Sequence, residues 1–372
     1  MLSDWSRGVV LDFFELKRGF DITARQAISG EVPVYSSAGV SYYHNKALAD
    51  GPGVVIGRKG SVGSIHYVDQ SFWPHDTTLW VRDFKGNVPK YVFYYLHSLN
   101  LVRFDEASSV PTLNRNNVHN KPCCFPPAPE QNKIVEVIET WDEAIGACKR
   151  LISTKQSRVK ALSRRLFEPC HPKSATRPDD WARFELGDVF SERDEQGRED
   201  DRLLSITMAG GVIDRDDVGR RDVSNHDKSS YKLILPGDLG YNTMRMWQGV
   251  CGLSQLRGIV SPAYTIVTPD NRYIDARYAA HLFKSRRMVF DFERYSQGLT
   301  SDTWNLKFPA FSKIVVHLPP IRLQKQQAAL MDALLCEIDV LERQRNGLAK
   351  QKRGLMQKLL TGEWRVKTKE KG

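Results

Sequence analysis

The stretch Gly57-Arg-Lys-Gly-Ser-Val-Gly63 contains the residue types of a phosphate-binding loop. A nucleotide-binding P-loop, however, has four residues between its first glycine and a Gly-Lys-Ser/Thr triplet that opens a helix. Here the glycine spacing differs, and the residues after Ser61 read Val-Gly-Ser-Ile-His-Tyr-Val, which is typical of a strand. The nucleotide interpretation therefore fails, and a basic hairpin that contacts a larger partner stays open.

Residues that could carry out catalysis are scattered along the chain. It has no Asn-Pro-Pro or Asp-Pro-Pro motif for methylation of an amino group, no G-x-G-x-x-G fingerprint and no Walker motif. Glu15-x-Lys17 and Asp83-x-Lys85 resemble half of a nuclease metal site, but such tripeptides occur by chance in most chains of this length. The six cysteines lack C-x-x-C spacing, so we expect free thiols and no zinc site. The sequence predicts no catalytic residue, metal or cofactor on this chain.

The net charge of the chain is +10, from 54 Lys and Arg residues against 44 Asp and Glu residues. This excess favours a polyanionic partner, most simply nucleic acid, with an ordinary basic protein as the alternative. The sequence has no run of 18 apolar residues and no basic-then-apolar start. We therefore expect no membrane span, no signal peptide and a cytoplasmic location, which also suits the free thiols.

Polar, basic and aromatic residues gather on the predicted loops of two segments. Arginine pairs with guanine in the major groove of DNA, whereas asparagine and glutamine pair with adenine. Any one such residue is more often a solvated loop residue, and their concentration in one loop set per segment is what indicates binding. The candidate DNA-contacting residues are Lys17, Arg18, Tyr43, His44, Asn45, Arg58, Lys59, Asn114 and Arg115 in the first segment, and Asn242, Arg245, Trp247, Gln248 and Arg257 in the second.

A duplicated framework must position these loops. The two halves of the chain match at a constant offset of 193 residues near their ends and of 176 residues near their beginnings. The matching pairs are Pro126 and Pro319, Gln131 and Gln324, Ile145 and Ile338, Arg150 and Arg343, Trp5 and Trp181, and Asp12 and Asp188. The chain is therefore a tandem of two half-units, each an irregular domain followed by a long helix.

Each long helix has apolar residues spaced alternately by four and three. Sustained over four or more heptads, this spacing predicts a coiled-coil seam rather than the face of a globular helix. Lys155, Arg345 and Lys352 interrupt the seam, as polar residues that fix register do. The seam residues are Ile138, Trp141, Ile145, Ile152 and Leu162 in the first helix, and Leu334, Ile338, Leu341, Leu348 and Leu355 in the second.

Charge predicts how the two helices pair. Acidic residues lie near the start of each helix, at 136–143 and 332–342, and only basic ones lie near its end, at 149–165 and 343–358. Antiparallel pairing sets each acidic half against the basic half of the other helix, so we infer an antiparallel pair. The alternative is two separate solvated helices, each of which complements its own macrodipole.

Short strand patterns separated by turn signals fill the segments between the helices. The expected order is a first mixed α/β domain at 1–122, a first long helix at 123–169, a linker at 170–180, a second mixed domain at 181–316, a second long helix at 317–364 and a basic tail at 365–372. The predicted fold class is α+β, with the two domains separated by two long antiparallel coiled-coil helices and related by a pseudo-two-fold internal repeat.

Several motifs give the chain a resemblance to a known family. GPGVVIGRKGSVG (51–63) with FWPHDTTLWV (72–81), and PGDLGYNTMRMWQGVCGLS (236–254) with GIVSPAYTIV (258–267), resemble two target-recognition domains. LPPIRLQKQQ (318–327) and RGLMQKLLTGEW (353–364) resemble a conserved helical region, and FPPAPEQNKI (125–134) is its weaker twin. In this order the motifs resemble the specificity subunit of a bacterial type I restriction-modification system over nearly the whole chain. Ala128 and Pro129 replace a leucine-containing turn that is usual in the family.

The resemblance implies a non-catalytic reader of double-stranded DNA. Each target-recognition domain would grip one half of a bipartite target, and the paired helices would serve as a spacer and a platform. The implied partners are two modification subunits, which bind S-adenosylmethionine and methylate adenine, and two restriction subunits, which use ATP and Mg. On this interpretation Gly57–Gly63 is a basic hairpin that faces DNA, with Arg58 and Lys59 toward phosphates or base edges.

Two other functions are consistent with parts of the sequence. One is a divergent methyltransferase or nuclease fusion, which would need a nucleotide or metal pocket that the motifs do not show. The other is an orphan DNA-binding adaptor whose partner genes are lost, and neighbouring reading frames would separate it from an active system.

Overall fold

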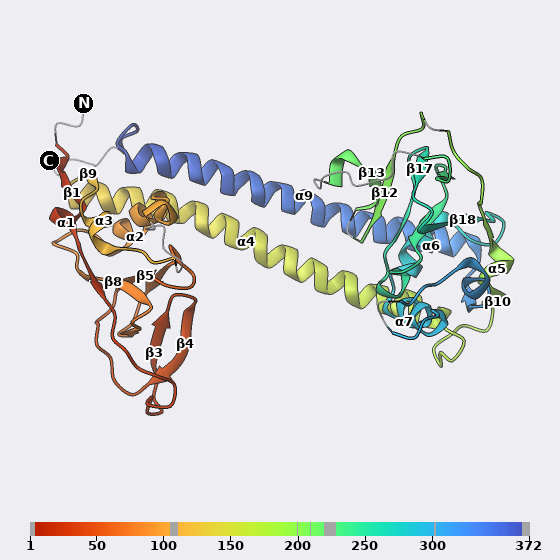
Figure 1. The fold of residues 1–372 in the computed structure, drawn as a ribbon, viewed down its shortest axis with the longest axis horizontal. Coiled ribbons are helices and arrows are strands. Elements are labelled where there is room, and N and C mark those ends of the chain that lie inside the picture. Colours follow the sequence, from red (N-terminus) through yellow and green to blue (C-terminus); the bar gives the residue numbers. More distant parts are fainter. Residues whose placement is uncertain are drawn as a thin grey trace. The chain divides into compact units, whose positions relative to one another are not determined.

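The computed structural model describes residues 4–104, 111–198, 200–208, 210–218, 228–300 and 303–366, and it confirms the predicted α+β class. Contacts divide the chain into two compact units (Figure 1). The first unit is Met1–Lys149 together with Arg343–Gly372, and the second is Arg150–Glu342. The long helices α4 (Ala128–Phe167) and α9 (Ile321–Leu360) each contribute one half to each unit.

The first unit is built on an antiparallel sheet with strand order β2-β8-β5-β6. A smaller sheet, β4-β3-β7, and the pair β1-β9 flank it. The elements are β1 (Ser6–Val9), α1 (Val10–Phe13), β2 (Glu15–Arg18), β3 (Val32–Ser36), β4 (Gly39–His44), β5 (Gly53–Gly57), β6 (Ile65–Val68), β7 (Trp73–Pro74), β8 (Thr78–Asp83), α2 (Pro89–Ser98), η1 (Leu101–Phe104), α3 (Arg115–His119) and β9 (Pro122–Phe125).

The second unit repeats this plan with a sheet of order β11-β18-β15-β16 and the pairs β10-β19, β12-β13 and β14-β17. Its elements are η2 (Glu168–Cys170), β10 (Ala182–Glu185), α5 (Leu186–Val189), β11 (Phe190–Glu192), β12 (Leu204–Thr207), β13 (Gly211–Asp214), η3 (Asp216–Val218), β14 (Lys232–Ile234), β15 (Leu239–Asn242), η4 (Met246–Gln248), β16 (Cys251–Leu253), β17 (Gly258–Val260), β18 (Tyr264–Pro269), α6 (Ala276–Phe283), α7 (Arg286–Tyr295), α8 (Phe308–Phe311) and β19 (Val315–Leu318).

The internal repeat extends to buried hydrogen bonds. Gln131 and Gln324 are both buried at the start of a long helix. Gln131 accepts from the N–H of Val88 at 2.8 Å and donates to the carbonyl of Pro126 at 2.8 Å. Gln324 accepts from the N–H of Asp275 at 3.0 Å and donates to the carbonyl of Pro319 at 2.9 Å. Each glutamine therefore ties a long helix to the N-terminus of a domain helix, α2 or α6.

We expect Gln131→Leu to lower the free energy of unfolding by about 2 kcal/mol. A leucine fills similar volume but leaves the N–H of Val88 and the carbonyl of Pro126 buried without this partner. Chemical denaturation of the variant measures the loss, and Asn132→Ala at the exposed neighbouring position is the control. A loss equal to that of the control would show that the glutamine does not hold α2 to α4.

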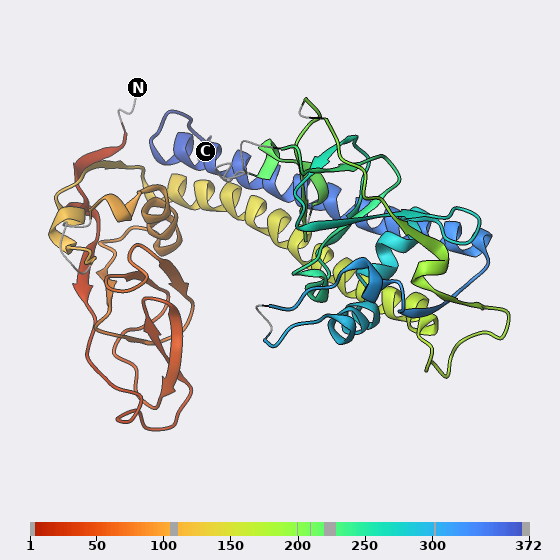
Figure 2. The same cartoon turned by 45° about the vertical axis from the view of Figure 1, so that its right-hand side comes forward.

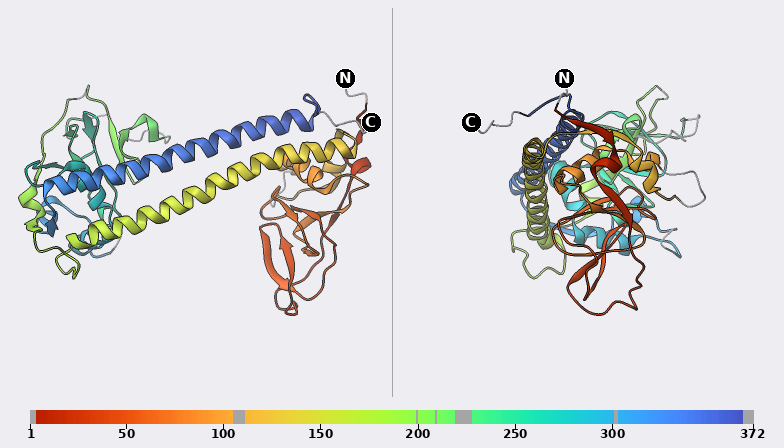
Figure 3. Two further views of the ribbon diagram at one scale, coloured as in Figure 1. Left: turned by 180° about the vertical axis from the view of Figure 1, so that it is seen from behind. Right: turned by 90° about the vertical axis from the view of Figure 1, so that its left-hand side faces the viewer.

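Within each unit the two long helices run antiparallel and side by side (Figures 2 and 3). The core of the first unit takes Ile134 from the start of α4 and Leu359 from the end of α9. The core of the second unit takes Phe167 from the end of α4 and Met331 from the start of α9. This is the orientation that the charge pattern predicts. All ten predicted seam residues are buried or half-buried.

Two of the three polar seam residues form ion pairs between the helices. In the first unit Lys352 of α9 contacts Asp142 of α4 at 2.6 Å. In the second unit Lys155 of α4 contacts Glu337 of α9 at 2.5 Å, and this contact lowers the pKa of Glu337. Each pair joins the basic end of one helix to the acidic start of the other, so both pairs favour the antiparallel register.

Several predicted boundaries differ from the structure. The region 123–169 was expected to be helical, but β9 continues to Phe125 and pairs with β1. Likewise 317–364 begins inside β19, which ends at Leu318. The prolines that follow each strand cannot donate to the strand ladder, so the helices begin only at Ala128 and Ile321. The linker 170–180 begins with buried residues of the second unit, and residues 367–372 of the predicted tail lie outside the described residues. In the described part of the chain, no helix is long and apolar enough to cross a membrane.

Candidate nucleic-acid interface

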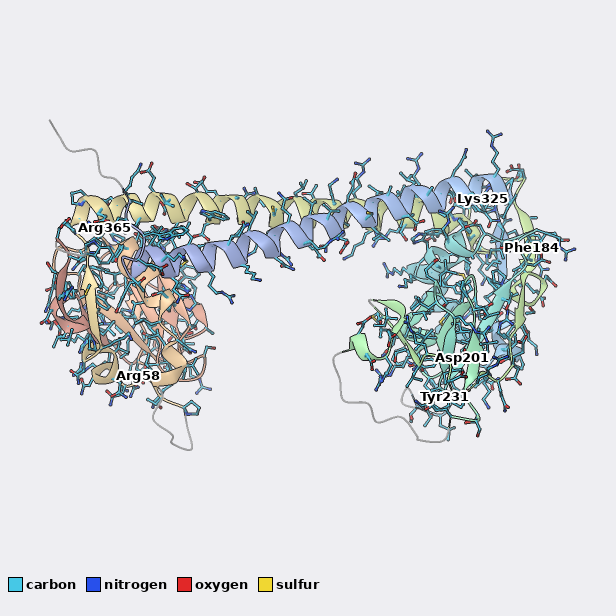
Figure 4. The ribbon with its side chains drawn as sticks, turned by 90° about the horizontal axis from the view of Figure 1, so that it is seen from above. Arg58, Phe184, Asp201, Tyr231, Lys325 and Arg365 are labelled. Carbon is cyan, nitrogen blue, oxygen red and sulfur yellow. The ribbon has the colours of Figure 1, made fainter. Side chains whose placement is uncertain are left out.

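Arg58 follows the last residue of β5, where Gly57 fixes a tight turn. A Cβ on Gly57 would lie 2.1 Å from the carbonyl oxygen of Ser61, so only glycine fits. The N–H of Arg58 donates to Thr77 at 2.8 Å, and its carbonyl accepts from Leu113 at 3.0 Å. The backbone of Arg58 is therefore held by two neighbouring segments. Figure 4 places its side chain on the face of the first unit away from α4 and α9.

Arg58 is among the residues that line a cavity of about 410 Å³. Four of the predicted contact residues line it together, and three of them are arginines. Burial and the nearby charge of Arg18 lower the pKa of Arg58, and its Nη1 atom is buried with no hydrogen-bond partner among the described residues. Asp76 contacts Arg18 at 3.0 Å. Among the described ion pairs, no carboxylate contacts Arg58 or Arg115. The lining residues are Arg18, Arg58, Leu79, Thr112, Leu113, Asn114 and Arg115, which we call the arginine pocket.

In the second unit four of the five predicted contact residues lie at the end of β15 and on the turn that follows it. Asn242 accepts from the N–H of Met244 at 3.0 Å, and Trp247 donates to the carbonyl of Met244 at 3.0 Å. Gly249, with φ of 81°, closes the turn. Trp247 packs edge to face against Trp304 with ring centroids 5.5 Å apart. Asn242, Arg245, Trp247 and Gln248 therefore come together as one surface, which we call the tryptophan turn, with Arg245 and Gln248 exposed.

The repeat shows which residues occupy equivalent places in the two domains. The N–H of Leu306 donates to the carbonyl of Thr243 at 2.8 Å. In the same way, the N–H of Leu113 donates to the carbonyl of Arg58. Leu113 and Leu306 are related by the offset of 193 residues, so Thr243 is the counterpart of Arg58. Asn114 and Lys307 are the equivalent N-caps of α3 and α8. The remaining counterparts, by the two offsets, are Asp194 for Arg18 and Phe308 for Arg115.

Other predicted contact residues are placed differently. His44 is buried, and its Nδ1 accepts from the N–H of Ile28 at 3.0 Å, so the structure does not support a DNA contact by this ring. Its neighbour Tyr43 is 54% exposed and Asn45 is exposed. His44 and Tyr43 differ in exposure because adjacent residues of β4 point to opposite faces.

Three basic candidates remain. Lys17 is half-buried with its ammonium 5.5 Å from the ring centroid of Phe20. Lys59 is exposed beside the arginine pocket, where an isolated antiparallel β-bridge joins its backbone to that of Thr112. Arg257 pairs with Asp201 at 3.3 Å next to β17 and is not among the residues of the tryptophan turn. Hydrogen bonds from Arg198 and Arg257 lower the pKa of Asp201, with the backbone N–H of Arg198 as the largest cause.

Sequence reasoning missed Lys307 and Thr243. Both lie at positions equivalent to predicted contact residues of the first domain, and the offset of 193 residues, applied to Asn114, finds Lys307 directly. Thr243 has no such signal, because its equivalence to Arg58 depends on a backbone hydrogen bond rather than on a constant offset.

One group of metal-ligand type exists in the described part of the chain, formed by Asp21, His75 and Asp76. Both ring nitrogens of His75 already have partners, because Nδ1 lies 3.0 Å from the hydroxyl of Thr77 and Nε2 lies 3.1 Å from the carbonyl of Ile22. Asp76 is held by Arg18. His75 and Asp76 therefore already have partners in the protein, and Asp76 helps to position Arg18.

The chain is similar to specificity subunits of type I systems. The family model "Type I restriction modification DNA specificity domain" matches residues 3–154. The MjaVIII specificity subunit of Methanocaldococcus jannaschii is 23% identical over 304 residues, which cover 74% of this chain and 70% of the relative. A putative type I specificity subunit of Mycoplasma pneumoniae is 23% identical over 342 residues, which cover 87% of this chain and 88% of the relative.

Two solved structures share the fold. The S subunit of a type I restriction-modification system from M. genitalium aligns with a TM-score of 0.64 at 15% identity and covers 96% of both chains. A chain from a study of complex assembly and conformational transition of the type I system aligns with a TM-score of 0.58 at 13% identity and covers 97% of this chain and 99% of that chain.

Proposed function

We propose that the two domains of this chain bind the two parts of a divided duplex target, because the chain belongs to the family of type I restriction-modification DNA specificity subunits. The observation that carries the proposal is the duplicated scaffold with different side chains at equivalent places. Arg18, Arg58 and Arg115 in the first domain correspond to Asp194, Thr243 and Phe308 in the second. One scaffold with two chemistries suits two domains that each hold one part of the target in a different way.

The antiparallel helices supply the symmetry for such binding. Each domain contacts the start of one long helix and the end of the other, and the internal repeat predicts a pseudo-two-fold relation between the two halves of the chain. Duplex DNA has a similar local two-fold, and readers related in this way contact half-sites about one helical turn, roughly 34 Å, apart. The helical pair would therefore act as the spacer that sets the gap.

The chain is the DNA-recognition subunit and not the catalytic one. We propose that it assembles in the cytoplasm with two modification subunits, which would carry S-adenosylmethionine, and two restriction subunits, which would carry ATP and Mg. The relative whose study concerns assembly of the type I system supports partnership with other subunits.

A double variant of the tryptophan turn tests the proposal. In a pool of duplexes with randomised sequence, the full chain is expected to enrich a divided motif. Arg245→Ala with Gln248→Ala should lower the preference at one or two base pairs of one half-motif, by about 5- to 150-fold if the contacts are bidentate. The other half-motif should stay as it is, because its reader lies in the first unit.

The matched control is Arg272→Ala, another exposed arginine of the second unit, which pairs with Asp270. It should leave the enriched motif unchanged. Loss of preference in both half-motifs together would contradict the assignment of one half-target to each domain.

A further inference from the structure

We propose that the arginine pocket of the first domain binds one backbone phosphate of the duplex and does not read a base. The inference rests on the proposed function and deepens it, because it assigns a chemical group to a site whose ligand the fold alone leaves open. It also predicts that the two domains hold DNA in different ways.

The recess around Arg58 is the first argument. Base edges lie at the floor of a major groove about 8.5 Å deep, so a side chain that reads them must project from the protein surface. Arg58 comes immediately after β5, its side chain is half-buried and lines the pocket, and its Nη1 atom is buried. Phosphates are the outermost groups of a duplex and can enter such a recess. The geometry therefore favours a phosphate, which can enter the recess and reach Arg58.

Charge is the second argument. Three arginines line the pocket. Among the described ion pairs, the carboxylate that contacts one of these arginines is that of Asp76, which pairs with Arg18. A buried guanidinium atom without a hydrogen-bond acceptor is unfavourable. A phosphate supplies acceptor oxygens and negative charge in a geometry that matches the planar fork of arginine. No base edge supplies a negative charge.

The second domain provides the contrast. At the equivalent places it carries Asp194, Thr243 and Phe308, with Lys307 as the one basic residue of the set. Asp194 is paired with Lys232 at 3.0 Å. An acid and an aromatic ring cannot form a triple-arginine phosphate site. The phosphate anchor therefore belongs to the first domain, and the tryptophan turn of the second domain carries exposed side chains that can reach into a groove.

Arg58→Ala and Arg58→Lys in the full chain test the inference, with the randomised duplex pool as the probe. Removal of a phosphate contact should weaken binding by about tenfold for all sequences and leave the enriched motif unchanged. The slope of log affinity against log salt should fall by about 0.9, because one fewer counterion is released. Arg58→Lys keeps a positive charge, so it should keep the wild-type salt slope and the motif.

The control is Lys133→Ala, which removes one exposed charge on α4 that is paired with Glu136. It should change neither the affinity nor the slope. The inference is overturned if Arg58→Ala or Arg58→Lys erases the preference at one base pair, or if Arg58→Ala leaves both affinity and salt slope unchanged. Should Arg58→Ala fail to fold, Arg58→Lys still decides, because a bidentate contact to guanine does not survive that exchange. A wild-type chain that enriches no motif would instead contradict the proposed function itself.

Discussion

Arg365→Ala is expected to lower the free energy of unfolding by about 3 kcal/mol. Arg365 binds the carboxylate of Glu130 through Nε at 2.7 Å and Nη2 at 2.8 Å. Glu130 is 4% exposed and accepts one further hydrogen bond, from the indole of Trp5 at 3.1 Å. The variant leaves a buried carboxylate without its cation, which is among the most destabilising changes a single substitution can make. The bidentate contact also raises the pKa of Arg365, so the arginine stays charged.

Asp4→Ala is the matched control for this prediction. Asp4 contacts the same arginine at 3.2 Å, but its side chain is 61% exposed. Exposed ion pairs contribute about 0–1 kcal/mol, so this variant should unfold close to the wild type in chemical denaturation. Equal losses for the two variants would show that burial of Glu130 is not what makes the contact strong.

Asp238→Ala is expected to have a similar effect in the second unit, with a loss of about 3 kcal/mol. Asp238 is buried and receives hydrogen bonds from Nε of Arg193 at 2.8 Å, from the hydroxyl of Thr268 at 2.7 Å and from the N–H of Leu235 at 2.8 Å. The hydrogen bond with Asp238 is the largest cause that raises the pKa of Arg193. Without Asp238, a largely buried guanidinium and two further donors lose their acceptor.

Glu195→Ala isolates the role of burial, because Glu195 contacts the same Arg193 at 2.9 Å with a side chain that is 65% exposed. It should cost less than about 1 kcal/mol. Hydrogen exchange adds a second measurement, since Asp238→Ala should lower the protection of β15 and β18 more than that of β5 and β8. Equal loss of protection in both sheets would contradict the division into two units.

The sequence predicted the features that depend on local periodicity and on self-similarity. The alternation by four and three predicted both long helices, and the charge gradient predicted the antiparallel pairing that Lys352 and Asp142 display. The offset of 193 residues even related two buried glutamines whose hydrogen bonds prove equivalent. These signals are carried by residues close together on one helix or repeated at a constant spacing.

Features that depend on burial and on distant pairing could not be predicted. Arg58 and Arg245 are both candidate contact residues in the sequence, but the backbone hydrogen bonds make Thr243 the counterpart of Arg58. His44 has the residue type of a contact but faces the interior. The arginine pocket joins β2, the turn after β5 and the N-cap of α3, which only the folded sheet brings together.

Selection of the wild-type chain on the randomised duplex pool tests the central claim most directly. Two domains of one scaffold with unlike contact residues predict two conserved blocks of different sequence, separated by a degenerate gap of one fixed length. A single continuous block, two blocks with a variable gap, or two identical blocks would contradict the account of two unlike readers on a helical spacer.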